Sequence, residues 1–134
     1  MEYTENYHLN QWDPTDRVLR TDFNSDNQKI DAALNEKCEF VTGRYTGNGA
    51  ETRVISLGFT PKAVLVLRED GATTYPNNNT QVYGGLAAVG MPLKKSGLDA
   101  VAVVDGGFQV GYRTYPIDIY TNNSNQVYHY LALR

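Results

Sequence analysis

The spacing of apolar residues changes near residue 39, and this change predicts a boundary between two parts of the chain. Before it, apolar side chains recur at helical intervals in a polar background. After it, short apolar or alternating runs are separated by glycine, asparagine and proline, which is typical of strands and turns. The sequence therefore predicts an arm over residues 1–12, a helical stem over residues 13–38 and a β-rich head over residues 39–134.

The stem is predicted as one helix from residue 14 to residue 37. Asp13 is a favourable N-cap, Pro14 suits the first helical position, and neither glycine nor proline interrupts residues 15–37. The narrow stripe expected to mediate oligomerisation advances by four, three and four residues, as a coiled-coil seam does, and consists of Phe23, Asn27, Ile30 and Leu34. Two uses of this stripe stay open: packing of a single amphipathic helix on its own domain, or self-association with Asn27 fixing the register.

Six or seven short strands are predicted in the head. Two hairpins are expected, one joining residues 40–46 to 52–57 through Gly-Asn-Gly, the other joining residues 100–104 to 108–113 through Asp-Gly-Gly. Further runs cover residues 62–67, 81–89 and 127–133, and the last alternates regularly between two faces. The predicted fold class is mainly β: an antiparallel β-sandwich of six or seven strands, preceded by one N-terminal α-helix.

The charge of the chain changes at the same position. Residues 1–39 carry nine acidic and four basic side chains, whereas residues 40–134 carry six acidic and eight basic ones. The net charge of −3 over 134 residues lacks the basic excess of a typical nucleic-acid binder. No apolar run has the length of a membrane span and no signal-peptide pattern opens the chain, so we expect synthesis in the cytoplasm without membrane insertion.

Patterns for catalysis and metal binding are not found in the sequence. The single cysteine, Cys38, has no neighbouring histidine, and His129 stands between two tyrosines in a predicted strand. No serine lies in a Gly-x-Ser-x-Gly elbow, and the few acidic residues of the head form no recognisable pair. We therefore expect no enzyme, no cofactor and no metal site, and the sequence assigns no role to Cys38 or His129.

Two long connections in the head resemble each other. Residues 73–80 and residues 114–125 each contain Thr-Tyr-Pro followed by a cluster of asparagines. Tyrosine offers a flat apolar ring with a hydroxyl, and asparagine offers a donor and an acceptor, which together suit sugar hydroxyls. A simpler interpretation, in which asparagine and proline only form turns, stays open. The predicted ligand-binding residues are Tyr75, Asn77, Asn78, Tyr115, Tyr120, Asn122 and Asn123.

Residues 7–34 resemble a segment of bacteriophage or prophage tail proteins. In these, an arm with Leu-Asn-Gln-Trp leads into a helix with Asp-Phe-Asn-x-Asp-Asn-x-Lys-Ile-Asp-Ala-Ala-Leu, as residues 9–12 and 22–34 do here. Residues 45–49, 55–66 and 128–133 resemble the β modules that end phage fibres. The resemblance implies a homotrimeric fibre or tip protein in the virion tail, with a host-surface-binding head on a short helical stem.

A second resemblance, of the head alone, is to H-type lectin domains. Phe59, Pro61-Lys62, Gly107-Phe108 and the final aromatic strand follow the lectin pattern, although that strand has tyrosine where tryptophan is usual. This likeness implies a six-stranded sandwich that forms trimers and binds sugars near subunit boundaries.

Two functions are therefore weighed against each other. The first is a tail-fibre protein that binds a host bacterial surface glycan through the loops of its head. The alternative is a purely structural connector of the tail or baseplate that contacts other virion proteins and binds no glycan. A small depolymerase is a third class, and it would need acidic residues clustered at a groove between subunits.

Overall fold

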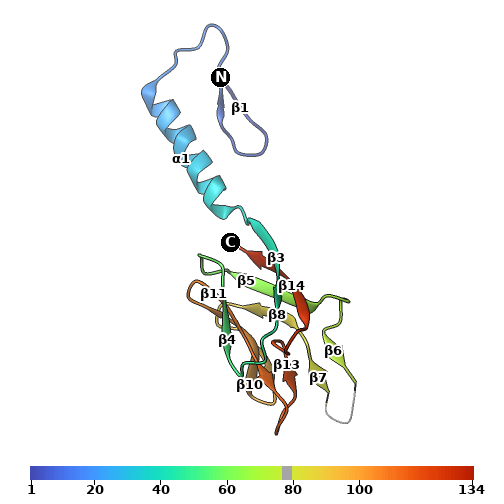
Figure 1. Ribbon diagram of the computed structural model, residues 1–134. Helices are drawn as coiled ribbons and strands as arrows, with labels where there is room; N and C mark the ends of the chain where they lie inside the picture. Colours follow the sequence, from blue (N-terminus) through green and yellow to red (C-terminus); the bar gives the residue numbers. More distant parts are fainter. Residues whose placement is uncertain (77–79) are drawn as a thin grey trace. The chain divides into compact units, whose positions relative to one another are not determined.

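The computed structural model spans Met1 to Arg134 and describes every residue except 77–79. It divides into two compact units, Met1–Cys38 and Glu39–Arg134 (Figure 1). The described residues form fourteen strands, most of them in antiparallel sheets, and one α-helix. The predicted mainly β class with one helix near the N-terminus is confirmed. No helix in this described part of the chain has the length and apolarity needed to cross a membrane.

The first unit contains β1 (Glu2–Tyr3), β2 (Asn10–Gln11) and α1 (Arg20–Glu36), with β1 and β2 paired antiparallel. The helix begins at residue 20 rather than at the predicted residue 14. Asp13 closes a local turn instead: its N–H donates to the Asp16 carboxylate over 2.9 Å, and its carbonyl accepts from the Asp16 N–H over 2.9 Å. Such side-chain-to-backbone bonds compete with helix formation, and the N-cap is Leu19.

A buried carboxylate attaches the arm to α1, and the Lys29 ammonium adds a bond to the His8 carbonyl. Asp26, only 8% exposed, accepts the Asn10 N–H at both oxygens over 3.1 and 3.0 Å and the Asn10 amide over 3.0 Å. Trp12 packs on Phe23 with ring centroids 5.1 Å apart. Residues 1–12 therefore lie along the helix within this unit.

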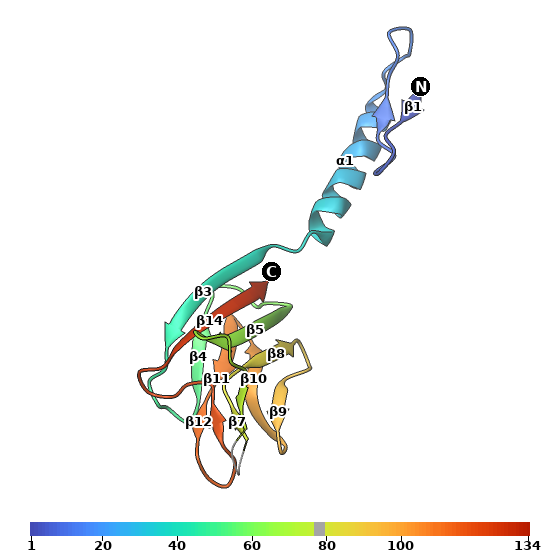
Figure 2. The ribbon, with the colours of Figure 1, turned by 90° about the vertical axis from the view of Figure 1, so that its right-hand side faces the viewer.

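The second unit is built on two antiparallel sheets of four strands. Sheet I has the order β3 (Phe40–Thr46), β14 (Val127–Leu133), β5 (Ala63–Arg68) and β8 (Gly85–Ala88). Sheet II has the order β4 (Arg53–Ser56), β11 (Gly107–Val110), β10 (Leu98–Val104) and β9 (Leu93–Lys95). Figures 1 and 2 show the strands of both sheets within this unit.

A smaller sheet III extends one end of this unit. Its order is β12 (Tyr112–Arg113), β13 (Ile119–Tyr120), β7 (Gln81–Val82) and β6 (Thr74–Tyr75). The pairs β12–β13 and β6–β7 are antiparallel, whereas β13 and β7 run parallel. Strand β6 contains the threonine and tyrosine of the first Thr-Tyr-Pro segment, and β12 ends directly before the second segment.

Sheets I and II share one hydrophobic core. Val64, Val66 and Tyr128 from sheet I meet Val101 and Phe108 from sheet II, all without exposed surface. Burial of side chains of this size contributes roughly 1.5–3 kcal/mol each. Tyr128 also stacks on Tyr45 with ring centroids 4.9 Å apart, and burial raises the pKa of Tyr128 to about 12.

The strand predictions were correct for the two seven-residue runs and for the hairpin with the Asp-Gly-Gly turn. The strands at residues 40–46 and 127–133 are confirmed, as is the hairpin of β10 and β11. The other hairpin is wrong, because β3 pairs with β14 and β4 pairs with β11, so Gly-Asn-Gly carries the chain from one sheet to the other. The predicted strand 81–89 is divided between β7 and β8 at Gly84, where a Cβ would lie 2.0 Å from the Val66 carbonyl oxygen. The described part of the head has twelve strands, several of two residues, in place of six or seven.

Replacing Asp26 by alanine should loosen the arm from α1 at Asn10. The change removes the acceptor that the Asn10 N–H shares between two oxygens and one of the two acceptors of the Asn10 amide, and an orphaned donor costs about 1–3 kcal/mol. Hydrogen exchange at the Asn10 amide should therefore accelerate about tenfold or more. Asp31→Ala, an exposed position of the same helix, is the matched control. Unchanged exchange in Asp26→Ala would contradict this attachment.

Candidate functional site

Sheet III brings the two Thr-Tyr-Pro segments to one end of the second unit. Tyr75 lies in β6, Tyr115 follows β12 by two residues, and β13 and β7 connect the two strands through continuous pairing. In both ribbon views this end lies away from the C-terminal strand end at Arg134 (Figures 1 and 2). The fold therefore gathers segments that are about 40 residues apart in sequence.

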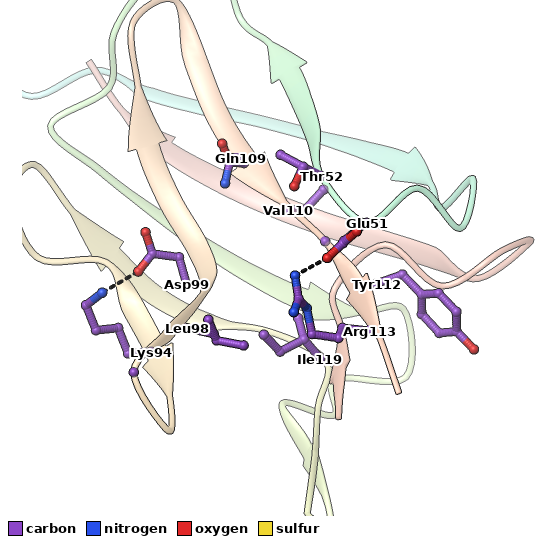
Figure 3. Close-up of a pocket in the computed structure, with 12 residues that line it drawn as sticks. Glu51, Thr52, Lys94, Leu98, Asp99, Gln109, Val110, Tyr112, Arg113 and Ile119 are labelled. Carbon is purple, nitrogen blue, oxygen red and sulfur yellow. Dashed lines mark hydrogen bonds and ion pairs between the residues drawn. The ribbon is translucent and has the colours of Figure 1, made fainter. Parts of the chain in front are cut away.

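Two adjoining pockets open beside this sheet. The first has a volume of about 290 Å³ and lies against β9, β10, β11 and β12 (Figure 3). The second has a volume of about 300 Å³ and extends towards Gly49, Thr114 and Tyr115. Both are lined by Glu51, Tyr112 and Arg113, and we call them together the paired pockets.

Two ion pairs supply the charge of the paired pockets. The Arg113 guanidinium donates to the Glu51 carboxylate, and the Lys94 ammonium donates to Asp99 over 2.6 Å (Figure 3). All four side chains are at least one-third exposed, and such pairs contribute about 0–1 kcal/mol each. The site is thus close to neutral, and its charged groups can exchange one hydrogen-bond partner for another at little cost.

The remaining lining combines polar and apolar groups. Gln109 and Thr52 add amide and hydroxyl groups near the ion pairs, whereas Leu98, Val110 and Ile119 provide an apolar floor. Tyr115, 85% exposed, stands at the edge of the second pocket. The arrangement offers donors, acceptors and a free aromatic ring within one surface.

Behind the pockets, the backbone around Gly111 lies in close contact with residues 50–51 and with Thr121. Gly111 connects β11 to β12, and a Cβ there would lie 2.5 Å from the Glu51 carbonyl oxygen. The Gly111 N–H donates to the buried Thr121 hydroxyl over 2.9 Å, and the hydroxyl donates to the Ala100 carbonyl over 2.7 Å. The Tyr112 N–H donates to the Ala50 carbonyl over 3.1 Å. These bonds place Glu51 next to Arg113.

Asn122, predicted as a ligand contact, is instead a buried structural residue. Its amide nitrogen donates to the Asn48 side-chain oxygen over 2.7 Å and to the Ala50 carbonyl over 3.0 Å. Its side-chain oxygen accepts from the Asn48 N–H over 3.2 Å and from the Arg53 guanidinium over 3.3 Å. The side chain has no exposed surface and its hydrogen-bonding capacity is used, so we correct its assignment.

The other predicted residues fall into three groups. Tyr75 and Tyr115 are exposed, by 53% and 85%, and keep their predicted role as a proposal. Tyr120 is half-buried between Tyr83 and Tyr112, and this burial raises its pKa. Asn123 is half-buried, and its N–H donates to the Tyr128 hydroxyl over 3.1 Å. Asn77 and Asn78 lie outside the described residues.

Sequence reasoning missed the charged residues of the paired pockets. Glu51, Lys94, Asp99 and Arg113 come from or beside four different strands and show no regular spacing. The one available signal was the position of Arg113 directly before the second Thr-Tyr-Pro segment. Within the described residues, no three His, Cys, Asp or Glu side chains are grouped so that they could hold a metal ion.

Comparisons of the chain with protein-family models, with curated proteins and with solved structures found no match.

Replacing Asn122 by alanine should lower the free energy of unfolding by about 1–3 kcal/mol, because buried partners such as the Ala50 carbonyl lose their hydrogen bonds. Tyr115→Ala, at the exposed edge of the same region, should change it by less than about 0.5 kcal/mol. Urea denaturation monitored by circular dichroism measures both. Equal stability of Asn122→Ala and the wild type would contradict the structural role.

Proposed function

We propose that this chain is a tail-fibre or tail-tip protein of a bacteriophage or prophage, and that its head binds a glycan of the host bacterial surface. The glycan assignment rests on one observation: two exchangeable ion pairs and an exposed tyrosine ring border the same paired pockets. The tail assignment rests on the resemblance of residues 7–34 to tail proteins. We further propose that sheets I and II act as a β-sandwich head and that α1 forms a trimeric stem.

The chemistry of the paired pockets suits a polyhydroxylated ligand. Each sugar hydroxyl both donates and accepts, so it can bridge a carboxylate such as Glu51 and a cation such as Arg113. The ring of Tyr115 offers a flat face for the C–H side of a pyranose. Volumes near 300 Å³ are at the small end of ligand pockets and suit a short glycan segment.

Useful affinity would come from repetition of this site. A single hydrogen bond to an exposed side chain contributes about 1 kcal/mol. Three heads on one stem would bind a repeating surface polymer with an avidity well above the affinity of one site. We propose binding without catalysis, in which Glu51 and Asp99 act as acceptors.

The exposed seam of α1 supports self-association. Phe23, Ile30 and Leu34 are 50%, 41% and 59% exposed, although Trp12 contacts Phe23. Tyr7, Ala33 and Lys37 line a shallow apolar depression of about 150 Å³ together with Ile30 and Leu34. A polar helix with an apolar stripe that is only partly covered has more to gain from a partner helix than from solvent.

Glycan binding should be lost most clearly in Tyr115→Ala and Arg113→Ala. Each removes one contact from every head, so apparent affinity for the bound polysaccharide should fall tenfold or more. Binding to arrays of bacterial surface glycans measures this. Lys62→Ala, exposed near the other end of the head, is the control and should bind as the wild type does. A wild-type protein that binds no bacterial glycan would favour the alternative function, a structural tail or baseplate connector.

The oligomeric stem predicts a solution mass three times the 14.9 kDa of one chain. Ile30→Asp places a charge in the apolar seam and should shift the light-scattering mass towards the single chain. Asp31→Asn, at the next position and outside the seam, should leave the mass unchanged. A wild-type chain that is monomeric at micromolar concentration would contradict the stem.

A further inference from the structure

The two main sheets of the head differ in what they expose on their outward faces. Outward positions of sheet II include the polar residues Ser56, Lys94, Asp99 and Gln109, beside the smaller apolar residues Val54, Ala102 and Val104. An antiparallel sheet with one face in water normally has such a pattern. Sheet I departs from it, because leucine and phenylalanine occupy many of its outward positions.

The outward face of sheet I carries large apolar side chains on all four strands, although β3 also presents Thr42, Arg44 and Thr46 there. Leu131 in the second strand lies opposite Leu65, and Leu65 lies opposite Leu86, while Leu133 lies opposite Phe40. Phe40 and Leu86 are 67% and 64% exposed. A shallow groove of about 530 Å³ on this surface is lined by Leu65, Leu67 and Leu131 together with Thr42, Arg44 and His129. We call Phe40, Leu65, Leu67, Leu86, Leu131 and Leu133 the apolar face.

The polar side chains of this surface lie on β3 and near the start of β14. Arg44 and His129 face each other across β3 and β14 and are exposed, and Thr42 lies opposite Leu131. An apolar centre with a polar margin is the usual composition of a protein–protein interface. A glycan, by contrast, would find few donors and acceptors on the leucine-rich centre.

We propose that the apolar face binds a second copy of this chain, within the same assembly that α1 forms. Four strands spaced about 4.8 Å apart, each contributing about five residues, give a footprint of roughly 300–400 Å². Stable interfaces bury about 800 Å² on each partner. The apolar face therefore needs a second contact in the same complex to be occupied.

The seam of α1 provides that second contact. It is also short: α1 has 17 residues and a length of about 25 Å, less than the three or four heptads of an autonomous coiled coil. Phe40, the first residue of the apolar face, follows the last helical residue, Glu36, by only four positions. Helix association would therefore raise the effective concentration of one head near another to the millimolar range. Another copy of this chain carries both surfaces, which makes it the partner that fits.

This inference rests on the self-assembly in the proposed function but not on glycan binding. Leu86→Glu places a charge at an exposed position of the apolar face, and Val54→Glu places the same charge at an exposed position, 51%, of the outward face of sheet II. In the full chain, Leu86→Glu should raise the dissociation constant of the oligomer at least tenfold, and Val54→Glu should leave it unchanged. Analytical ultracentrifugation over a concentration series measures both.

The outcomes separate the inference from the proposed stem. Dissociation by Ile30→Asp but not by Leu86→Glu would overturn the apolar face as a self-interface and leave the stem intact. Oligomers of Leu86→Glu that are as stable as the wild type, or a face that binds only a different protein, would overturn it as well. Phe40→Glu repeats the test on β3, and near-ultraviolet circular dichroism establishes that each variant is folded. A weakened oligomer in folded Leu86→Glu and Phe40→Glu, with Val54→Glu unchanged, is the expected result.

Discussion

The buried hydrogen bonds of residues 120–123 hold the three sheets of the head in place. The Thr121 hydroxyl forms hydrogen bonds with the backbone of Ala100 and Gly111. The backbone carbonyl of Thr121 accepts a hydrogen bond from the Tyr45 hydroxyl over 2.6 Å. Asn122 joins the Gly-Asn-Gly crossover to the start of β4, and the Tyr128 hydroxyl donates to the Tyr120 carbonyl. Buried polar groups are costly unless paired, so the chain can depart from this arrangement only by leaving several of them unsatisfied.

This buried segment also explains why the paired pockets exist. The bonds that end β11 at Val110 and turn the chain into β12 are the same bonds that place Arg113 beside Glu51. The ion pair itself is exposed and contributes little to stability. Its position is therefore maintained by the buried network, and its side chains remain available to a ligand. Rigid backbone beneath exchangeable side chains is the arrangement that a binding site requires.

The two outward faces of the head suit the two proposed functions, glycan binding and self-association. Sheet II and sheet III expose charges, amides and tyrosine rings, which suit a hydrated ligand. Sheet I exposes leucine and phenylalanine, which suit another protein surface. With the short seam of α1, the head would both complete the assembly and present three copies of the paired pockets.

The sequence by itself determined the local elements: the strands at 40–46 and 127–133, the β10–β11 hairpin and the helical character of the stem. These depend on alternation, helical spacing and a turn of Asp-Gly-Gly, which act over a few residues. Tertiary structure decided the rest. The Asp13–Asp16 turn displaced the helix start, and pairing with β14 and β11 drew β3 and β4 into different sheets. The burial of Asn122, the meeting of Glu51 with Arg113 and the exposure of the leucines of sheet I all depend on contacts between distant segments. The spacing of residues within one segment cannot predict such contacts, because they are stabilised by burial between segments in the folded core.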